Sequence, residues 1–234
     1  MTPRQGVTTA LLRHRTTTAG PEEQMVVSAL ASLRDAFGSP CVLMRELQMP
    51  TGVPDAVAVL MRHAEVPLEA ARLNVGSSDL RLLHHLATVK QSTVNDIEAA
   101  LRWNAADLRR MIRTLSDAGL LRETRGAVRV HRLTDIFHAR KIIAVEAKMK
   151  DWQRALMQAV ANTWFASHSY ILLPERPLSD SLNEAAKRFG IGVMTFDGQR
   201  TRTRIRAAAR PLPASYGSWL VHENALRLAQ RSPA

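Results

Sequence analysis

The run of residues 141–149 constrains the fold most, because it sets Glu146 and Lys148 within a stretch that is otherwise apolar after Lys141. Its alternating pattern predicts a β-strand, in which successive side chains point to opposite faces of the sheet. One face would then carry Ile142, Ala144, Glu146 and Lys148. An ionised group that is buried without a partner costs several kcal/mol, so we expect Glu146 and Lys148 to have a chemical use. A plain ion pair on an edge strand is the alternative.

The segments around this strand predict an α/β fold. Pro21 opens a helix with two glutamates in its first turn, and Gly38 closes it. Two short apolar runs, 41–47 and 55–61, flank a turn that contains proline and glycine, which indicates a β-hairpin. After the strand at 141–149, the pattern predicts a helix from residue 152, a strand at 170–173, a helix at 179–189, a strand at 191–196 and a final helical stretch.

Residues 64–136 show a pattern of short helices and a hairpin that differs from the flanking segments, and they are predicted to be an inserted module. Helices are expected from Ser77, Thr93 and Asn104, each of which can cap a helix. Residues 120–133 then alternate around Arg125-Gly126, which predicts a two-stranded wing. This arrangement resembles the winged helix-turn-helix family, and we expect an all-α module with a wing. The resemblance implies DNA contacts in the major groove from the third helix and at the wing. The arginines concerned are Arg109, Arg110, Arg113, Arg122, Arg125 and Arg129.

The overall charge favours a polyanionic partner. The formal net charge is +11 and the sequence pI is about 11.0, and lysine and arginine release counterions when they neutralise phosphates. Near the C-terminus, Arg200, Arg202, Arg204 and Arg206 would share one face of a strand and could contact phosphates. The alternatives are a merely basic globular protein and a solvated basic loop.

An acid in the hairpin suggests a metal site. Asp55 begins the second apolar run, and an adjacent antiparallel strand could bring it beside Glu146. Two carboxylates provide the hard oxygen ligands that Mg²⁺ prefers, and Lys148 could orient the attacking water and offset phosphate charge. We therefore expect Mg²⁺ (or Mn²⁺) at this position.

These residues resemble the PD-(D/E)XK motif of restriction-endonuclease-like nucleases, as Pro54-Asp55 followed by Glu146-Ala147-Lys148. The family's αβββαβ core, with a mixed sheet, matches the predicted order once the insert is set aside. The resemblance implies metal ligands from Asp55, Glu146, the carbonyl of Ala147 and a further acid. Glu46 ranks first for that acid, ahead of Glu22 and Glu23. It also implies an active-site glutamine in the following helix, which would be Gln158. One departure is that the insert separates the acid from the Glu-Ala-Lys strand.

The organisation expected from the sequence is a disordered basic arm at 1–20, a discontinuous nuclease-like core at 21–63 and 137–234, and the winged module at 64–136. The expected partner is DNA, double-stranded, with a homodimer left open. The expected activity is hydrolysis of phosphodiester bonds, and the alternative is an inactive nuclease-like fold that regulates transcription by binding DNA. Cys41 is the single cysteine and no apolar run approaches the roughly 20 residues needed to cross a bilayer. We therefore expect a cytoplasmic protein that does not enter a membrane.

Overall fold

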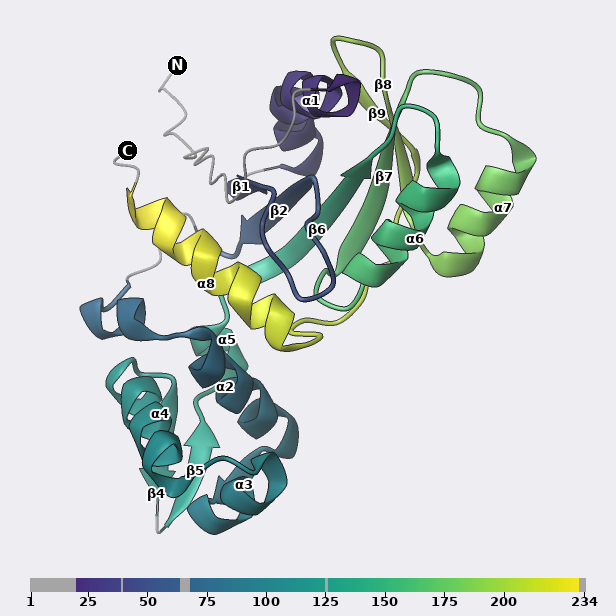
Figure 1. Ribbon diagram of the computed structural model, residues 1–234. Coiled ribbons are helices and arrows are strands. Elements are labelled where there is room, and N and C mark those ends of the chain that lie inside the picture. The colour runs from purple at the N-terminus through teal and green to yellow at the C-terminus, as the bar shows by residue number, and fades with distance from the viewer. Residues whose placement is uncertain (1–19, 39, 64–67, 125, 232–234) are drawn as a thin grey trace. The chain divides into compact units, whose positions relative to one another are not determined.

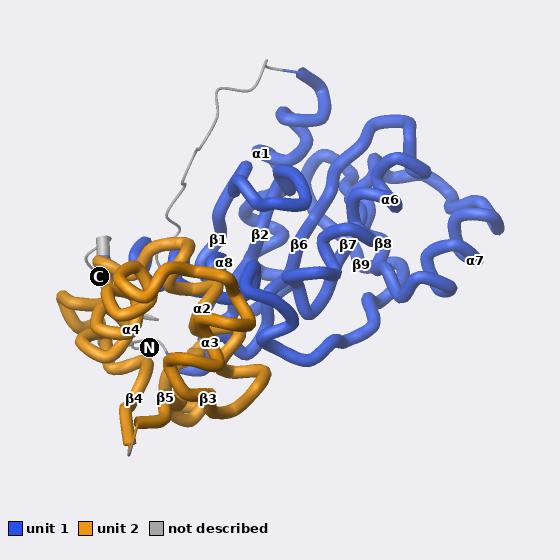
Figure 2. The backbone as a smooth tube through the Cα atoms, turned by 60° about the horizontal axis from the view of Figure 1, so that its bottom comes forward, with its two compact units in different colours: residues 1–64, 139–234 blue, residues 65–138 orange. Residues whose placement is uncertain are grey.

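The computed structural model describes residues 20–38, 40–63, 68–124 and 126–231. The chain divides into two compact units, residues 1–64 with 139–234 and residues 65–138, which Figure 2 colours separately. The predicted arm lies, apart from residue 20, outside the described residues.

Unit 1 is built on a mixed six-stranded sheet in the order β1-β2-β6-β7-β8-β9. The parallel pairs are β6–β7 and β7–β8, and the other neighbours are antiparallel. Helices connect the parallel strands, as such crossovers require. The strands are β1 (Cys41–Arg45), β2 (Ala56–Met61), β6 (Ala139–Ala147), β7 (His168–Pro174), β8 (Gly192–Phe196) and β9 (Thr201–Ile205).

Helices cover both faces of this sheet (Figure 1). Helix α1 (Pro21–Phe37) packs on one face through Met25, Val26, Ala29 and Leu33. Helices α6 (Trp152–Asn162) and α7 (Asp180–Phe189) pack on the other face over β7 and β8. Helix α8 (Tyr216–Arg231) packs against β1, β2 and β6. The coarse α/β prediction is confirmed.

The key strand β6 lies in the interior of the sheet, hydrogen-bonded to β2 and β7. The alternative of an ion pair on an edge strand is therefore wrong. The side chains of β6 alternate between the two faces of the sheet as predicted, because Ile143, Val145 and Ala147 belong to the core under α1. Glu146 thus points toward the opposite face, the one that α6 covers.

The strand directions bring one set of strand ends to a common edge. The strand ends of β1, β6, β7 and β8 lie beside the starts of β2 and β9, as the pairing registers require. We call this the carboxyl edge. Residues that follow or precede the strands here include Glu46, Asp55, Lys148, Glu175 and Asp197.

Unit 2 combines short helices with a small antiparallel sheet of order β3-β5-β4. Leucines and isoleucines of α2, α3 and α4 form its core, among them Leu83, Ile97 and Leu108. The elements are η1 (Ala70–Asn74), α2 (Ser77–Val89), β3 (Gln91–Thr93), α3 (Val94–Leu101), α4 (Ala105–Asp117), β4 (Leu121–Thr124), β5 (Ala127–Val130) and α5 (Leu133–Ile136).

The expected all-α module with a two-stranded wing needs a correction, because β3 adds a third strand. Thr93 serves two elements at once. It pairs with Ala127 in the sheet, and its hydroxyl accepts the Asp96 N–H at 3.2 Å as the N-cap of α3. A three-residue polar strand carries no hydrophobic alternation, so the sequence pattern indicated only the cap.

In the described part of the chain, the helices are all too short or too polar to cross a bilayer.

Candidate functional site

Asp55 stands at the carboxyl edge, immediately before β2. Its Oδ2 accepts the backbone N–H of Ala147 at 2.7 Å, which fixes the carboxylate against the end of β6. The register that pairs Ala56 with Val145 makes this contact possible. Burial raises the pKa of Asp55, while the Ala147 hydrogen bond and the charge of Lys148 oppose that rise. The structure thus brings the two predicted strand segments together at the predicted acid.

Glu146 is buried, with 2% of its surface exposed. Its Oε1 accepts a hydrogen bond from Nδ2 of Asn162 at 2.6 Å. Burial, with the charge of Asp55 as the next cause, raises the pKa of Glu146 to about 8. The hydrogen bond from Asn162 and the charge of Lys148 act in the opposite direction. Near neutral pH this carboxyl group therefore tends to hold a proton when no other cation is near.

Lys148 follows β6 and reaches across to α1. Its Nζ donates to Oε2 of Glu22 and to the carbonyl of Ala147, both at 2.9 Å. The carbonyl predicted as a metal ligand is thus the one that holds the lysine. Because the Glu22 side chain is about half exposed, at 46%, this ion pair lies where a ligand can compete for it.

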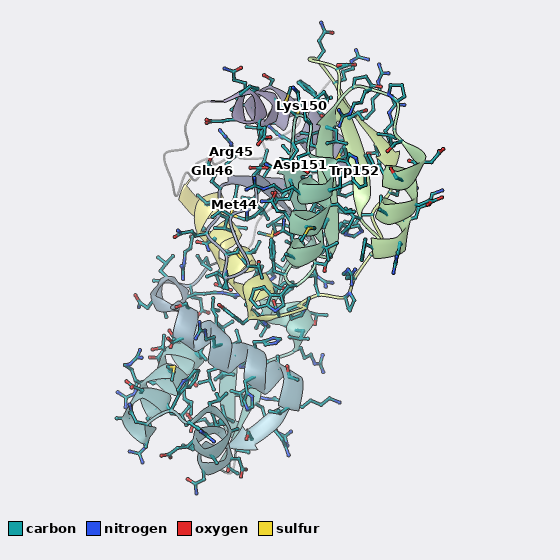
Figure 3. All side chains as sticks on the ribbon, turned by 45° about the vertical axis from the view of Figure 1, so that its right-hand side comes forward. Met44, Arg45, Glu46, Lys150, Asp151 and Trp152 are labelled. Carbon is teal, nitrogen blue, oxygen red and sulfur yellow. The ribbon has the colours of Figure 1, made fainter. Side chains whose placement is uncertain are left out.

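A pocket of about 350 Å³ opens at Asp55, and neither Glu146 nor Lys148 is among the residues that line it. Its wall combines the first turn of α1 with the ends of β1 and β6 and the start of β2. Figure 3 labels Arg45 and Glu46, which follow one another at the end of β1. The lining residues are Gly20, Pro21, Glu22, Glu23, Val26, Arg45, Glu46, Asp55 and Met149.

Glu46, the predicted additional acid, lines this pocket with Asp55. Its backbone adopts a φ of 51°, a left-handed conformation that is uncommon outside glycine. Such strain persists where the surrounding structure enforces it, and it often accompanies functional sites. Arg45 is buried beside it, with Nη2 at 3.4 Å from Oε1 of Glu23 and 3.7 Å from Oε1 of Glu46.

The fit of a divalent cation can be judged from these donors. Within the described residues, no group of three or more histidine, cysteine, aspartate or glutamate side chains is gathered tightly enough to hold a metal ion. The charge of Asp55 does, however, raise the pKa of Glu146, and a cation relieves that kind of repulsion. The donors are hard oxygens, which suit Mg²⁺ or Mn²⁺ better than softer metals.

Helix α6 contributes a residue that was missed from the sequence. Gln158 was predicted to lie at the site, but its Oε1 is buried without a hydrogen-bond partner in the described part of the chain. Asn162, one helical turn later, makes the contact with Glu146. The sequence did contain an indication of this role. Asn162 continues the apolar stripe of Ala155 and Ala159 at helical spacing, and a polar residue in such a buried stripe needs a hydrogen-bond partner.

The arginines predicted to bind DNA in unit 2 are exposed. Arg109, Arg110 and Arg113 stand on the side of α4 opposite its buried residues. In the small sheet Arg122 pairs directly with Arg129, and both are exposed. Like charges opposite one another are unfavourable unless an anion lies nearby. Arg125 lies outside the described residues.

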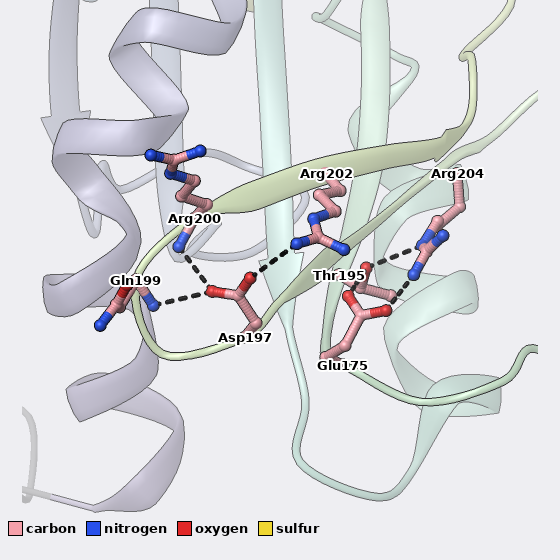
Figure 4. Close-up of polar contacts among 7 residues, drawn as sticks. All are labelled: Glu175, Thr195, Asp197, Gln199, Arg200, Arg202 and Arg204. Carbon is pink, nitrogen blue, oxygen red and sulfur yellow. Dashed lines mark hydrogen bonds and ion pairs between the residues drawn. The ribbon is translucent and has the colours of Figure 1, made fainter.

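Two of the arginines at β9 form ion pairs with carboxylates of the same sheet edge, which was not expected from the sequence (Figure 4). Nη2 of Arg202 is 3.3 Å from Oδ2 of Asp197. Arg204 pairs with Glu175, and its Nε donates to the Thr195 hydroxyl at 3.1 Å.

The expected single face of four arginines is also interrupted. Val193 pairs with Ile205 and Met194 with Thr203, so Arg204 is the extra residue of a β-bulge. Arg200 and Arg206 flank the strand and are exposed.

Comparisons with known proteins give no family for this chain. No protein-family model, no curated protein and no solved structure matches it.

Proposed function

We propose that this chain is a metal-dependent deoxyribonuclease that hydrolyses phosphodiester bonds. The observation that carries the proposal is the hydrogen bond from the Ala147 amide to Asp55, which fixes this acid at the end of β6, where its charge raises the pKa of buried Glu146. The element order α1, β1, β2, β6, α6, β7 in unit 1 supports a PD-(D/E)XK nuclease core. Unit 2, with three helices and a small sheet, supports a winged helix-turn-helix insert.

Asp55, Glu146, the carbonyl of Ala147 and Glu46 would hold Mg²⁺ or Mn²⁺ if binding drew the three carboxylates together, since they do not form a ready-made metal group among the described residues. When bound, such an ion polarises a phosphoryl oxygen and lowers the pKa of a water molecule. The chain's own contribution begins with deprotonation, because Glu146 must release its proton to act as a ligand. Asn162 then holds one oxygen of that carboxylate in a fixed orientation.

Lys148 would act on the substrate side of the same edge. Its ammonium group is held by Glu22 and by the Ala147 carbonyl, and it would have to release that carbonyl for an ion to bind there. An incoming phosphate could replace the half-exposed Glu22 as its partner, which would place a positive charge beside the reacting group. In that position Lys148 offsets phosphate charge and orients the attacking water.

Unit 2 would supply DNA affinity. Arg109, Arg110 and Arg113 on α4 present guanidinium groups to solvent, where they can contact base edges or phosphates. The Arg122–Arg129 pair would gain from a phosphate placed near both charges.

A DNA-binding protein without catalysis is the second candidate. It is favoured by the lack, in the described residues, of a three-ligand metal group and by the engagement of Lys148 with Glu22. An assay on labelled single-stranded, duplex and branched DNA, with Mg²⁺, Mn²⁺ or a chelator, separates the candidates. Cutting that requires the metal supports the nuclease, whereas binding without cutting under every condition supports the second candidate.

A further inference from the structure

A second hollow, of about 310 Å³, lies on the carboxyl edge beside the pocket of acids. One side of α1 contributes Gln24, Met25 and Ser28 to its lining. The other side consists of Met149 after β6 and the terminal residues of β7 and β8, Pro174 and Phe196. Its volume is within the range of small-molecule sites, about 300 to 1,000 Å³.

The lining of this hollow suits a flat apolar ring with polar edges. Met25 and Phe196 are mostly buried, at 7% and 6% exposure, and form an apolar floor. Gln24 and Ser28 are exposed on α1 and can exchange hydrogen bonds with a ring edge. Nucleobases have apolar faces for stacking and polar edges, and methionine adapts its shape to such surfaces.

The hollow shares part of its wall with the proposed catalytic pocket. Pro21 and Met149 line both of them. A nucleotide whose phosphate reached the acids near Asp55 would therefore have its base or its neighbour's base at the hollow.

Cationic residues also lie at the carboxyl edge. Lys150 and Arg200 are exposed, and Nη2 of Arg176 donates to the carbonyl of Lys150 at 3.5 Å. These residues come after β6, before β9 and after β7, respectively. They could neutralise the phosphates that flank the bound nucleotide.

We propose that the hollow lined by Met25, Met149, Pro174 and Phe196 binds an unpaired nucleobase next to the phosphate that is cut. The inference rests on the proposed nuclease function. A base in this hollow cannot remain stacked and paired in a duplex. The preferred substrate at this site is therefore single-stranded DNA or a frayed duplex end, even where unit 2 holds duplex DNA.

The test compares two ligands that differ only in the base. Thymidine 5′-monophosphate and deoxyribose 5-phosphate are titrated with Mg²⁺ into protein that carries ¹³C-methyl methionine, and methyl signals are followed by NMR. The signals of Met25 and Met149 are assigned by leucine substitution. The nucleotide should shift both signals, whereas the sugar phosphate should leave Met25 unmoved and bind at least about tenfold more weakly, because base stacking is lost.

A matched pair of variants on α1 locates the effect. Ser28→Phe fills the hollow and should weaken nucleotide binding about tenfold or more. Ala31→Phe adds the same ring at an exposed α1 position outside the hollow and should leave binding unchanged. Neither residue belongs to the acid cluster.

Equal binding of the two ligands, or equal behaviour of the two variants, overturns the base site. Metal-dependent cutting of DNA together with either of those results leaves the nuclease intact and removes only the base site. Base-dependent shifts at Met25 in a protein that cuts no DNA support the base site and remove the nuclease.

Discussion

Asn162 on α6 donates a 2.6 Å hydrogen bond to the carboxylate of Glu146 on β6, and both side chains are almost fully buried. Removing the donor leaves a buried carboxyl group without this partner, which costs about 1 to 3 kcal/mol. Asn162→Ala should lower the free energy of unfolding by that amount and weaken Mn²⁺ binding. Urea denaturation and calorimetric titration measure the two effects.

The matched control for this change is Asn224→Ala. The Asn224 amide donates to a carbonyl within its own helix, that of Leu220. This variant should leave Mn²⁺ affinity unchanged. Equal Mn²⁺ affinity in wild type and Asn162→Ala would show that Asn162 does not position Glu146.

The raised pKa of Glu146 predicts how the stability of the metal-free protein depends on pH. An unfolded glutamate loses its proton near pH 4.5, whereas folded Glu146 keeps it to about pH 8. The folded state therefore binds the proton more tightly, and stability is full below about pH 4.5 and falls as pH rises toward 8. Each tenfold difference in proton affinity between the folded and unfolded states contributes roughly 1.4 kcal/mol to that loss.

Glu146→Gln should reduce the loss of stability between low and high pH, because an amide does not titrate. Denaturant midpoints measured with a chelator present, between pH 5 and pH 8, test the expectation. Some loss of stability with rising pH should remain in this variant, since the pKa of Asp55 is also raised. Identical slopes in wild type and Glu146→Gln would mean that Glu146 does not carry the effect.

The Arg122–Arg129 pair predicts opposite effects on stability and on binding. Arg129→Gln removes a like-charge pair, which should stabilise the protein by about 0.2 to 1 kcal/mol at low salt. The same variant should weaken DNA binding and reduce the salt dependence of binding by about one unit. Thermal denaturation and salt-dependent fluorescence anisotropy measure the pair of effects.

Arg132→Gln provides a comparison at an exposed arginine beyond β5. It removes one positive charge without touching the Arg122–Arg129 pair, so it should not stabilise the protein. Unaltered DNA affinity and salt slope in Arg129→Gln would exclude this surface from DNA binding.

Local patterns made the strand that carries Glu146 predictable from the sequence. Alternation of apolar residues fixes which side chains of β6 share a face, and the turn residues near Pro50 and Gly52 indicate the hairpin. Met49 and Gly52 do exchange backbone hydrogen bonds in that turn. With the hairpin and β6 adjacent, Asp55 had to lie near the end of β6.

Long-range partners were not predictable in the same way. The contact of Lys148 with Glu22 joins residues 126 positions apart, and no local pattern encodes it. Asn162 was missed because a glutamine one turn earlier matched the family resemblance. The bulge at Arg204 depends on pairing with β8, and the sequence alternates through residues 201–206 without a break that would reveal it.

The most direct measurement of the central claim is metal-dependent DNA cleavage by wild type, Asp55→Asn and Glu146→Gln, with DNA binding measured on the same samples. Wild type is expected to cut DNA with Mg²⁺ or Mn²⁺ and not with a chelator. Both variants should lose cutting and still bind DNA, since they remove carboxylates and leave every arginine in place. Cutting by Glu146→Gln at the wild-type rate, or wild-type protein that cuts no DNA with either metal, would contradict the proposed function.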